Sequence, residues 1–191
     1  MRIGIDVSNH NGLIDWALVG QSGVTLAMVK VSEGTDFIDT WASRNLHGAL
    51  AYGLMVGAYH YVRPGANTAI DEAVFFSACL ANLPKVSLVA CDSESAGVAR
   101  GVALDAWHSD WLEEVENLTG HTPRLYSNVD YILNHRLGQI RQAAKYPLWL
   151  ASWSSHEPTS PAPWLRPNGW QFMAGSRWPG VDEVDLSIWD Y

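Results

Sequence analysis

Two acidic residues separated by one position follow an apolar run near the middle of the chain. They belong to the segment Ala90-Cys91-Asp92-Ser93-Glu94. Residues i and i+2 of a strand point to the same face and lie ~6.5 Å apart along it, so we expect Asp92 and Glu94 to face one cleft. Like charges in a partly desolvated cleft raise the pKa of one carboxyl group beside an ionised partner, as glycoside cleavage requires. From these residues alone, a helix-capping Asp92 with a solvated Glu94 stays an equal alternative.

Acidic, aromatic or amide side chains also stand at the ends of other apolar runs. They are Asp6, Glu33, Tyr59, Tyr61, Tyr126, Trp149, Gln171 and Asp185. Structural alternatives remain open at this point. A turn with Ser8 and Asn9 also explains Asp6. A salt bridge with Lys30 also explains Glu33.

Tryptophan is unusually frequent, with 10 residues in the chain. Its flat ring stacks well on sugar faces, which suggests a carbohydrate site, although packing explains most single tryptophans equally simply. Leu148 and Leu150 flank Trp149 and point to the opposite face of a strand. We therefore expect the Trp149 ring to reach the cleft and stack on a sugar.

The histidines and cysteines do not form a metal-binding pattern. His60 lies between Tyr59 and Tyr61 and faces away from them, so we expect it to be packed and hydrogen-bonded. The other six histidines show neither HxH nor HExxH spacing, which predicts no metal site and no cofactor. Cys79 and Cys91 lie in apolar runs and are expected to be buried free thiols. No nucleophile elbow or phosphate-binding loop is present in the sequence.

The charge balance argues against several partners. The 191 residues carry 12 Lys and Arg against 20 Asp and Glu, a net charge of −8. Without a basic field, nucleic acid is not an expected partner. The apolar runs are far shorter than the roughly 20 residues that span a bilayer, so we expect a soluble protein that does not insert into membranes. We also expect a monomer.

Short apolar runs alternate with helix-length segments over most of the chain. Gly and Pro punctuation and apolar spacing predict strands at 2–8, 25–32, 55–62, 86–92, 123–127, 147–151, 169–173 and 183–188. They predict helices from 39 or 40 to 53, at 67–83, at 103–119 and at 128–134. Eight strands, the first five wrapped by helices, indicate one α/β domain over residues 1–191. We expect a modified TIM-like (β/α) barrel whose strand ends meet at one mouth.

Several ordered motifs resemble glycoside hydrolase family 25, the Chalaropsis-type lysozymes and phage endolysins. They are Asp6-Val7-Ser8, Ile14-Asp15-Trp16, Met28 to Gly34, Gly57 to Tyr61, Asp92-Ser93-Glu94, Leu148 to Ala151, Trp170-Gln171-Phe172 and Val184-Asp185-Leu186. They span essentially the whole chain. The proline-rich loop 154–167 has no counterpart in the family pattern, and no wall-binding domain is recognised.

The resemblance implies a muramidase that cuts the β-1,4 bond between N-acetylmuramic acid and N-acetylglucosamine in bacterial peptidoglycan. Glu94 would be the general acid and base, and Asp92 would support the transition state. Asp6 and Asp185 match further acidic residues of the family's cleft. Glu33, Tyr59, Tyr61, Tyr126, Trp149 and Gln171 are expected to bind the substrate. The Asp-x-Glu spacing resembles substrate-assisted glycosidases, in which the N-acetyl oxygen attacks; direct attack by an aspartate is the other mechanism, and both predict retention.

Two rival functions differ in their chemistry. A Trp-rich peptidoglycan-binding module would hold glycan without cutting it, and a metal-dependent deacetylase would need histidine ligands. No secretory signal is visible in the first residues. The resemblance to endolysins therefore implies a protein held in the host cytoplasm until a separate pore protein releases it to the cell wall.

Overall fold

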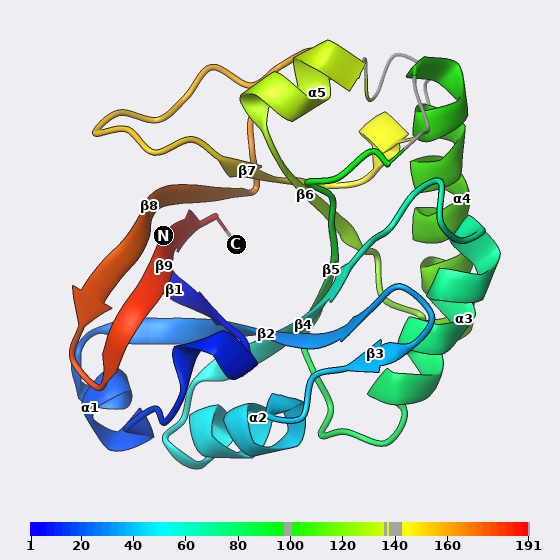
Figure 1. Cartoon of the computed structure of the whole chain (residues 1–191). Coiled ribbons are helices and arrows are strands. Elements are labelled where there is room, and N and C mark those ends of the chain that lie inside the picture. The colour runs from blue at the N-terminus through cyan, green and yellow to red at the C-terminus, as the bar shows by residue number, and fades with distance from the viewer. Residues whose placement is uncertain (98–100, 136, 138–142, 191) are drawn as a thin grey trace.

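The computed structural model describes residues 1–97, 101–135, 137 and 143–190. Within these residues, eight strands close into a barrel (Figure 1). They are β1 (Arg2–Val7), β2 (Val24–Glu33), β4 (Met55–Tyr61), β5 (Leu88–Asp92), β6 (Arg124–Asn128), β7 (Leu148–Ala151), β8 (Gly169–Trp178) and β9 (Val181–Trp189). The sheet order is β1-β9-β8-β7-β6-β5-β4-β2, and β1 pairs with β2 to complete the ring. The barrel expected from the sequence is confirmed.

Five α-helices follow the first five barrel strands along the chain. They are α1 (Trp16–Gln21), α2 (Ala42–Ala51), α3 (Ala69–Leu80), α4 (Gly101–Thr119) and α5 (Val129–His135). Two short 3-10 turns, η1 (Asn9–Asn11) and η2 (Ala143–Lys145), and a two-residue strand, β3 (Phe37–Ile38), which pairs with the end of β2, complete the described elements. Helix α1 was not predicted, although Asp15 caps it by accepting hydrogen bonds from the N–H groups of Ala17 and Leu18.

The last two strands form an antiparallel hairpin. β9 runs antiparallel to both β8 and β1, so the expectation that every strand end points to the same mouth is wrong for β9. Pro179 and Gly180 form the turn, with a φ of 89° at Gly180 that favours glycine. So short a connection reverses the chain and cannot make a parallel crossover. Asp185 therefore reaches the mouth from the middle of β9, paired with Asp6 of β1.

Apolar side chains form two layers, one on each face of the barrel wall. The outer layer packs against the helices and includes Leu148 and Leu150 of β7. The inner cluster fills the barrel and consists of Leu26, Met28, Leu88, Ala90, Tyr126, Trp149, Ala151 and Trp189. Trp189 fits because Gly4 and Gly169 lie beneath it; a Cβ at either position would approach the indole to 2.6 Å or less. Figure 1 shows α2 to α5 around β2 to β6, whereas α1 lies at the tip of the β8–β9 hairpin.

Among the described residues, no helix is long and apolar enough to cross a membrane.

Candidate active site

Asp6 and Asp185 face each other across neighbouring strands at the barrel mouth. The β1–β9 register places them opposite one another. The amide nitrogen of Gln171, on β8, lies 3.1 Å from Oδ2 of Asp6 and 3.3 Å from Oδ2 of Asp185, and donates to both. Oδ1 of Asp185 accepts a hydrogen bond of 2.7 Å from the N–H of Gly175. One buried glutamine thus holds two carboxyl groups together.

The carbonyl oxygen of the Gln171 amide is also hydrogen-bonded. Its Oε1 accepts a hydrogen bond of 3.0 Å from the hydroxyl of Tyr126 and one of 3.1 Å from Nε1 of Trp153. These two donors fix the amide orientation, so that its NH₂ group must face the aspartates. Tyr126 and Gln171 therefore meet as the sequence predicted, and their observed contacts are with the acidic site itself.

Asp92 and Glu94 approach the same mouth from β5. Asp92 ends the strand, is 8% exposed, and has no hydrogen-bond partner for Oδ1 within the described part of the chain. Glu94 lies two residues later, reaches solvent and shares a hydrogen bond with Asp92. The charge of Asp6 acts on Asp92, and that of Asp185 acts on Glu94. The structure therefore brings together the four carboxyl groups that the sequence singled out.

Burial raises the pKa of all four groups, and repulsion by other members of the cluster adds to this for Asp6, Asp92 and Glu94. Burial, followed by the charge of Asp185, raises the pKa of Asp6 to about 8. Burial raises the pKa of Asp92 well above its ordinary value, and the charges of Glu94 and Asp6 add to this. Burial also raises the pKa of Glu94 and of Asp185. A mouth with several such groups retains protons at neutral pH and can both donate and accept them.

Lys30 supplies positive charge beside this cluster. Its Nζ lies 2.7 Å from Oε2 of Glu33, which also pairs at 2.7 Å with the guanidinium of Arg63. Partial burial opposes the ionisation of Glu33, but the hydrogen bonds from Lys30 and Arg63 lower its pKa overall. The salt bridge left open by the sequence is present, made possible by a register shift between Lys30 and Ser32. The charge of Lys30 also offsets part of the rise in the pKa of Asp92 and of Glu94.

Two tyrosines of β4 line the same end of the barrel. Burial and the charges of Asp6 and Asp92 raise the pKa of Tyr59 well above its ordinary value. Burial and the charge of Asp92 raise the pKa of Tyr61 to about 12. Both phenols are therefore neutral at physiological pH and available as hydrogen-bond donors. The ammonium of Lys30 lies 5.1 Å from the centre of the Tyr61 ring.

Trp149 points into the barrel as expected, but it does not present a free face. It is 2% exposed, with its ring centre 4.4 Å from that of Tyr126 and 4.9 Å from that of Trp189. Its Nε1 donates to Oγ of Ser187 at 3.0 Å. The expectation of an accessible stacking face overlooked the narrow interior of the barrel, in which a ring on an inward position is covered by its neighbours.

Trp153 is the tryptophan that the sequence reasoning missed. It is 68% exposed while its Nε1 contacts Gln171, so its ring lies at the edge of the acidic site. The sequence did carry a signal for Trp153. It follows Trp149 by four residues, and residues an even number of positions apart along an extended segment point to the same face, so its side chain also points inward just beyond β7.

The histidine and cysteine predictions fare differently. His60 is buried between Oγ of Ser32 at 2.8 Å and Oε2 of Glu72 at 3.1 Å, which confirms a packed, hydrogen-bonded histidine. Both cysteines are free; Cys91 is buried as expected, while Cys79 is only partly buried. In the ranges that the structure describes, no group of three or more His, Cys, Asp or Glu side chains is arranged to hold a metal ion.

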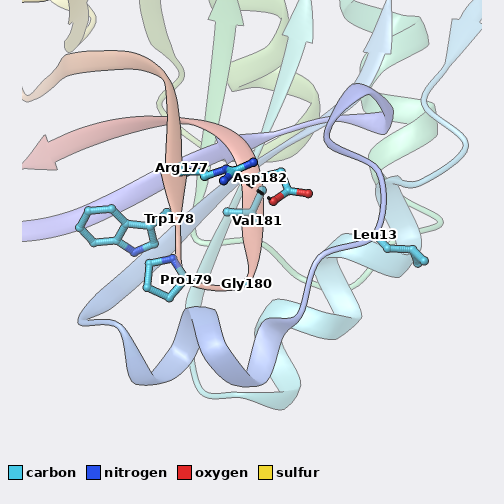
Figure 2. A pocket seen from close by; sticks show the side chains of 7 residues that line it. All are labelled: Leu13, Arg177, Trp178, Pro179, Gly180, Val181 and Asp182. Atoms are coloured by element: carbon cyan, nitrogen blue, oxygen red, sulfur yellow. Dashed lines mark ion pairs between the residues drawn. The ribbon is translucent and has the colours of Figure 1, made fainter.

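Several hollows in the described part of the chain lie near the mouth or on the β8–β9 hairpin. One of about 250 Å³ is lined by Asp6 and Asp185 together with Val7, Ser8, His10, Asn11, Tyr59, Glu183 and Val184. One of about 760 Å³ lies beside Trp153 and extends over Trp170 and Phe172. Figure 2 shows a third, of about 410 Å³, at the hairpin turn, and none of its seven lining residues belongs to the acidic cluster. The first is therefore the hollow that opens onto the candidate active site.

A closed barrel with acidic side chains gathered at one mouth is the architecture of a barrel glycoside hydrolase. The sequence model described as glycosyl hydrolases family 25 matches residues 5–181, and the chain belongs to this family. It is 30% identical over 193 residues to Lysozyme M1 of Streptomyces globisporus, an alignment that covers 95% of this chain and 65% of that protein. The matched chain corresponds to 65% of the length of the first curated relatives that it matches.

Two solved structures share the whole fold. The bacterial lysozyme from Streptomyces coelicolor superposes with a TM-score of 0.87 at 26% identity, covering 100% of this chain and 92% of that one. The muramidase from Trichobolus zukalii gives a TM-score of 0.88 at 26% identity, covering 100% and 94%. Both are similar to this chain over its full described length.

Proposed function

We propose that this chain is a muramidase that hydrolyses the β-1,4 bond between N-acetylmuramic acid and N-acetylglucosamine in bacterial peptidoglycan. One observation carries the proposal: Asp92 and Glu94 are hydrogen-bonded to each other at a mouth where Asp6 and Asp185 are also held. Family membership and the similarity to Lysozyme M1 support the choice of substrate. We further propose that residues 1–191 form one catalytic domain that acts as a monomer at the cell wall.

In this proposal Glu94 is the general acid and then the general base. It is the solvent-reaching member of the pair, which supports a role toward the glycosidic oxygen. Asp92 is buried, with a free Oδ1 that can accept the N–H of the substrate's N-acetyl group. Because a hydrogen bond to the charged form favours that form, substrate binding would ionise Asp92. Its proton would pass along the shared hydrogen bond to Glu94, which is then the protonated acid.

The reaction then proceeds in two displacements. The N-acetyl oxygen attacks the anomeric carbon while Glu94 gives its proton to the leaving oxygen, which breaks the glycosidic bond. Water next attacks the same carbon, and Glu94 takes the water's proton. The bond between the anomeric carbon and the N-acetyl oxygen breaks, which opens the five-membered ring formed in the first step and restores the N-acetyl group. Two inversions give retention. Asp6 and Asp185, bridged by Gln171, would maintain the charge balance around the pair.

The substrate-binding roles of Glu33, Tyr59, Tyr61, Tyr126, Trp149 and Gln171 stay predictions. The neutral phenols of Tyr59 and Tyr61 support a hydrogen-bonding role toward sugar hydroxyls. The burial of Trp149 favours packing, and the exposed ring of Trp153 is better placed to stack on a sugar.

The experiment is a wall-lysis assay with a matched variant. Wild type, in the presence of chelator, should clear a suspension of bacterial walls and release new reducing ends. Glu94→Gln keeps the size of the side chain but cannot donate a proton, so the rate should fall by at least about 100-fold. A variant with near wild-type turnover would remove Glu94 from the mechanism.

The same assay separates the two rivals. A binding module would sediment with walls and release no reducing ends. A metal-dependent deacetylase would release acetate and stop when chelator is added.

A further inference from the structure

A buried serine–histidine pair holds the segment that carries Asp92 and Glu94 at the end of β5. Ser93 lies between Asp92 and Glu94, and its Oγ is 2.5 Å from Nε2 of His108, on α4. Both side chains are fully buried. Successive residues at a strand end point to opposite faces, so Ser93 faces the helix layer while its neighbours face the mouth. This hydrogen bond links α4 to the segment that carries Asp92 and Glu94.

The hydrogen bonds of His108 define its tautomer. Its Nδ1 lies 2.7 Å from the carbonyl oxygen of Leu104, which can only accept, so Nδ1 carries the proton. Nε2 therefore accepts from the Ser93 hydroxyl. Burial lowers the pKa of His108 to about 4, so the ring is neutral above about pH 5. Glu72 of α3 and His135 of α5 are the charged or titratable groups that act on it.

The backbone of Ser93 is also held by hydrogen bonds. Its N–H donates to the carbonyl of Tyr126 at 2.9 Å, and its carbonyl accepts from Oγ of Ser127 at 2.6 Å. Strand β5 ends at Asp92, so Glu94 follows beyond the regular ladder. Ser93 is therefore anchored at its N–H, its carbonyl and its side chain immediately before Glu94.

We propose that His108 is a positioning residue that, through Ser93, holds Glu94 at its working distance from Asp92. The inference rests on the proposed function. A displacement of about 1 Å at a reacting group can cost up to about 100-fold in rate, so a single buried hydrogen bond next to Glu94 has a large effect on turnover.

The kinetic test compares two buried serine–histidine bonds. Ser93→Ala and His108→Leu should each lower kcat on walls by about 10-fold and leave KM within about twofold. The double variant should lose little more than either single one, because both break the same bond. His108→Gln retains an acceptor near the position of Nε2 and should recover most of the loss, which also covers failure of the leucine variant to fold.

Ser32→Ala is the matched control. It breaks the buried bond between Oγ of Ser32 and Nδ1 of His60, which is 2.8 Å long and belongs to β2 and β4. Its kcat should equal that of wild type at temperatures where it is folded. Equal kcat losses in Ser93→Ala and Ser32→Ala, or a loss confined to KM, would overturn the positioning role.

A second readout does not depend on activity. Carbon-13 titration of the carboxyl groups should show that Ser93→Ala moves the midpoints of Asp92 and Glu94 toward their ordinary values by at least about 0.5 pH unit. Ser32→Ala should leave them unchanged. The groups that face this pair are Asp6 of β1, Lys30 of β2, Tyr59 and Tyr61 of β4, Tyr126 of β6 and Asp185 of β9.

The two proposals can fail separately. If wild type releases no reducing ends, the proposed function is wrong, while the titration still tests the link from His108 to the carboxylates. If wild type cuts walls but Ser93→Ala keeps both the kcat and the midpoints of wild type, the positioning role is wrong.

Discussion

Helices α2 to α5 surround the part of the barrel from β2 to β6, which we call the covered half, whereas the part from β7 to β9, which we call the open half, has fewer helix contacts. The two halves hold their carboxyl groups in different ways. In the covered half, Asp92 and Glu94 follow a buried strand held by α4. In the open half, Asp185 lies within an antiparallel hairpin and is held by the Gln171 amide. Helices fix the first pair from outside, whereas interior hydrogen bonds fix the second. The stability of the open half therefore depends on the side chains that fill the barrel interior.

The largest effect should come from removing a ring inside the open half. Trp149→Ala should lower the free energy of unfolding by about 3 to 5 kcal/mol, because Trp149 is buried between Tyr126 and Trp189. Chemical denaturation measures this. Trp111, fully buried on α4, is the matched residue of the covered half, and Trp111→Ala should cost a similar amount. A loss below about 1 kcal/mol for Trp149→Ala alone would show that interior rings do not hold the open half together.

The next effect concerns Asp92 in the covered half. Asp92→Asn should lower turnover by at least about 10-fold, equivalent to ~1.4 kcal/mol, because in the proposed mechanism the charge of Asp92 supports the N-acetyl group and an amide carries no such charge. A thiazoline analogue of the cyclised intermediate should inhibit wild type competitively. Mass spectrometry of trapped enzyme should find no sugar attached; a sugar ester on Asp92 or Asp6 would establish direct attack instead.

Asp6 joins the two halves and should govern how stability depends on pH. Its pKa is about 8 in the folded protein, against an ordinary value of 3.8, so the folded state binds this proton more tightly than the unfolded chain. The free energy of unfolding should therefore fall as pH rises from about 4 to about 8, and this contribution should then level off. Asp6→Asn should exceed wild type by at least about 1 kcal/mol at pH 8 and match it near pH 4. Asp182→Asn, at an exposed position of β9, is the control and should follow wild type at every pH. Parallel stability curves for Asp6→Asn and wild type would refute the protonated state of Asp6.

The smallest effect on stability should come from the exposed edge of the open half. Trp153→Ala should change the free energy of unfolding by less than about 0.5 kcal/mol, because the ring is mostly in solvent. Glycan binding should weaken by about fivefold, consistent with the loss of ~1 kcal/mol of stacking. Titration with a soluble glycan fragment measures this, and unchanged affinity would exclude Trp153 from the binding edge.

The contrast between halves also explains what the sequence could predict. The covered strands are continuous apolar runs between helix signals, so their order, the barrel and the shared face of Asp92 and Glu94 could be read directly. In the open half, β8 buries only Gly169 and Gln171 and alternates exposed and partly buried residues from Met173 onward. Its hairpin also reverses β9, which the strand pattern alone did not reveal. The amide bridge from Gln171 to Asp6 and Asp185 joins residues up to 165 positions apart. Such a contact depends on tertiary register, for which local spacing carries no signal.

Exposure was the property least accessible to prediction. The parity of Trp149 indicated the inner face of the barrel, but only the packing of Tyr126 and Trp189 shows that this face is closed. The salt bridge between Lys30 and Glu33 similarly depends on a register shift inside β2.

The chemical identity of the new reducing ends of the glycan strands tests the proposed muramidase activity most directly. Purified walls digested by wild type would be reduced with borohydride, hydrolysed and analysed for amino-sugar alcohols, with Glu94→Gln digested in parallel. A muramidase leaves N-acetylmuramic acid at each new reducing end, so muramicitol should accumulate with wild type and fall at least about 100-fold with Glu94→Gln. Accumulation of glucosaminitol instead, or equal release by both proteins, would contradict the assignment of the acidic mouth as a muramidase site.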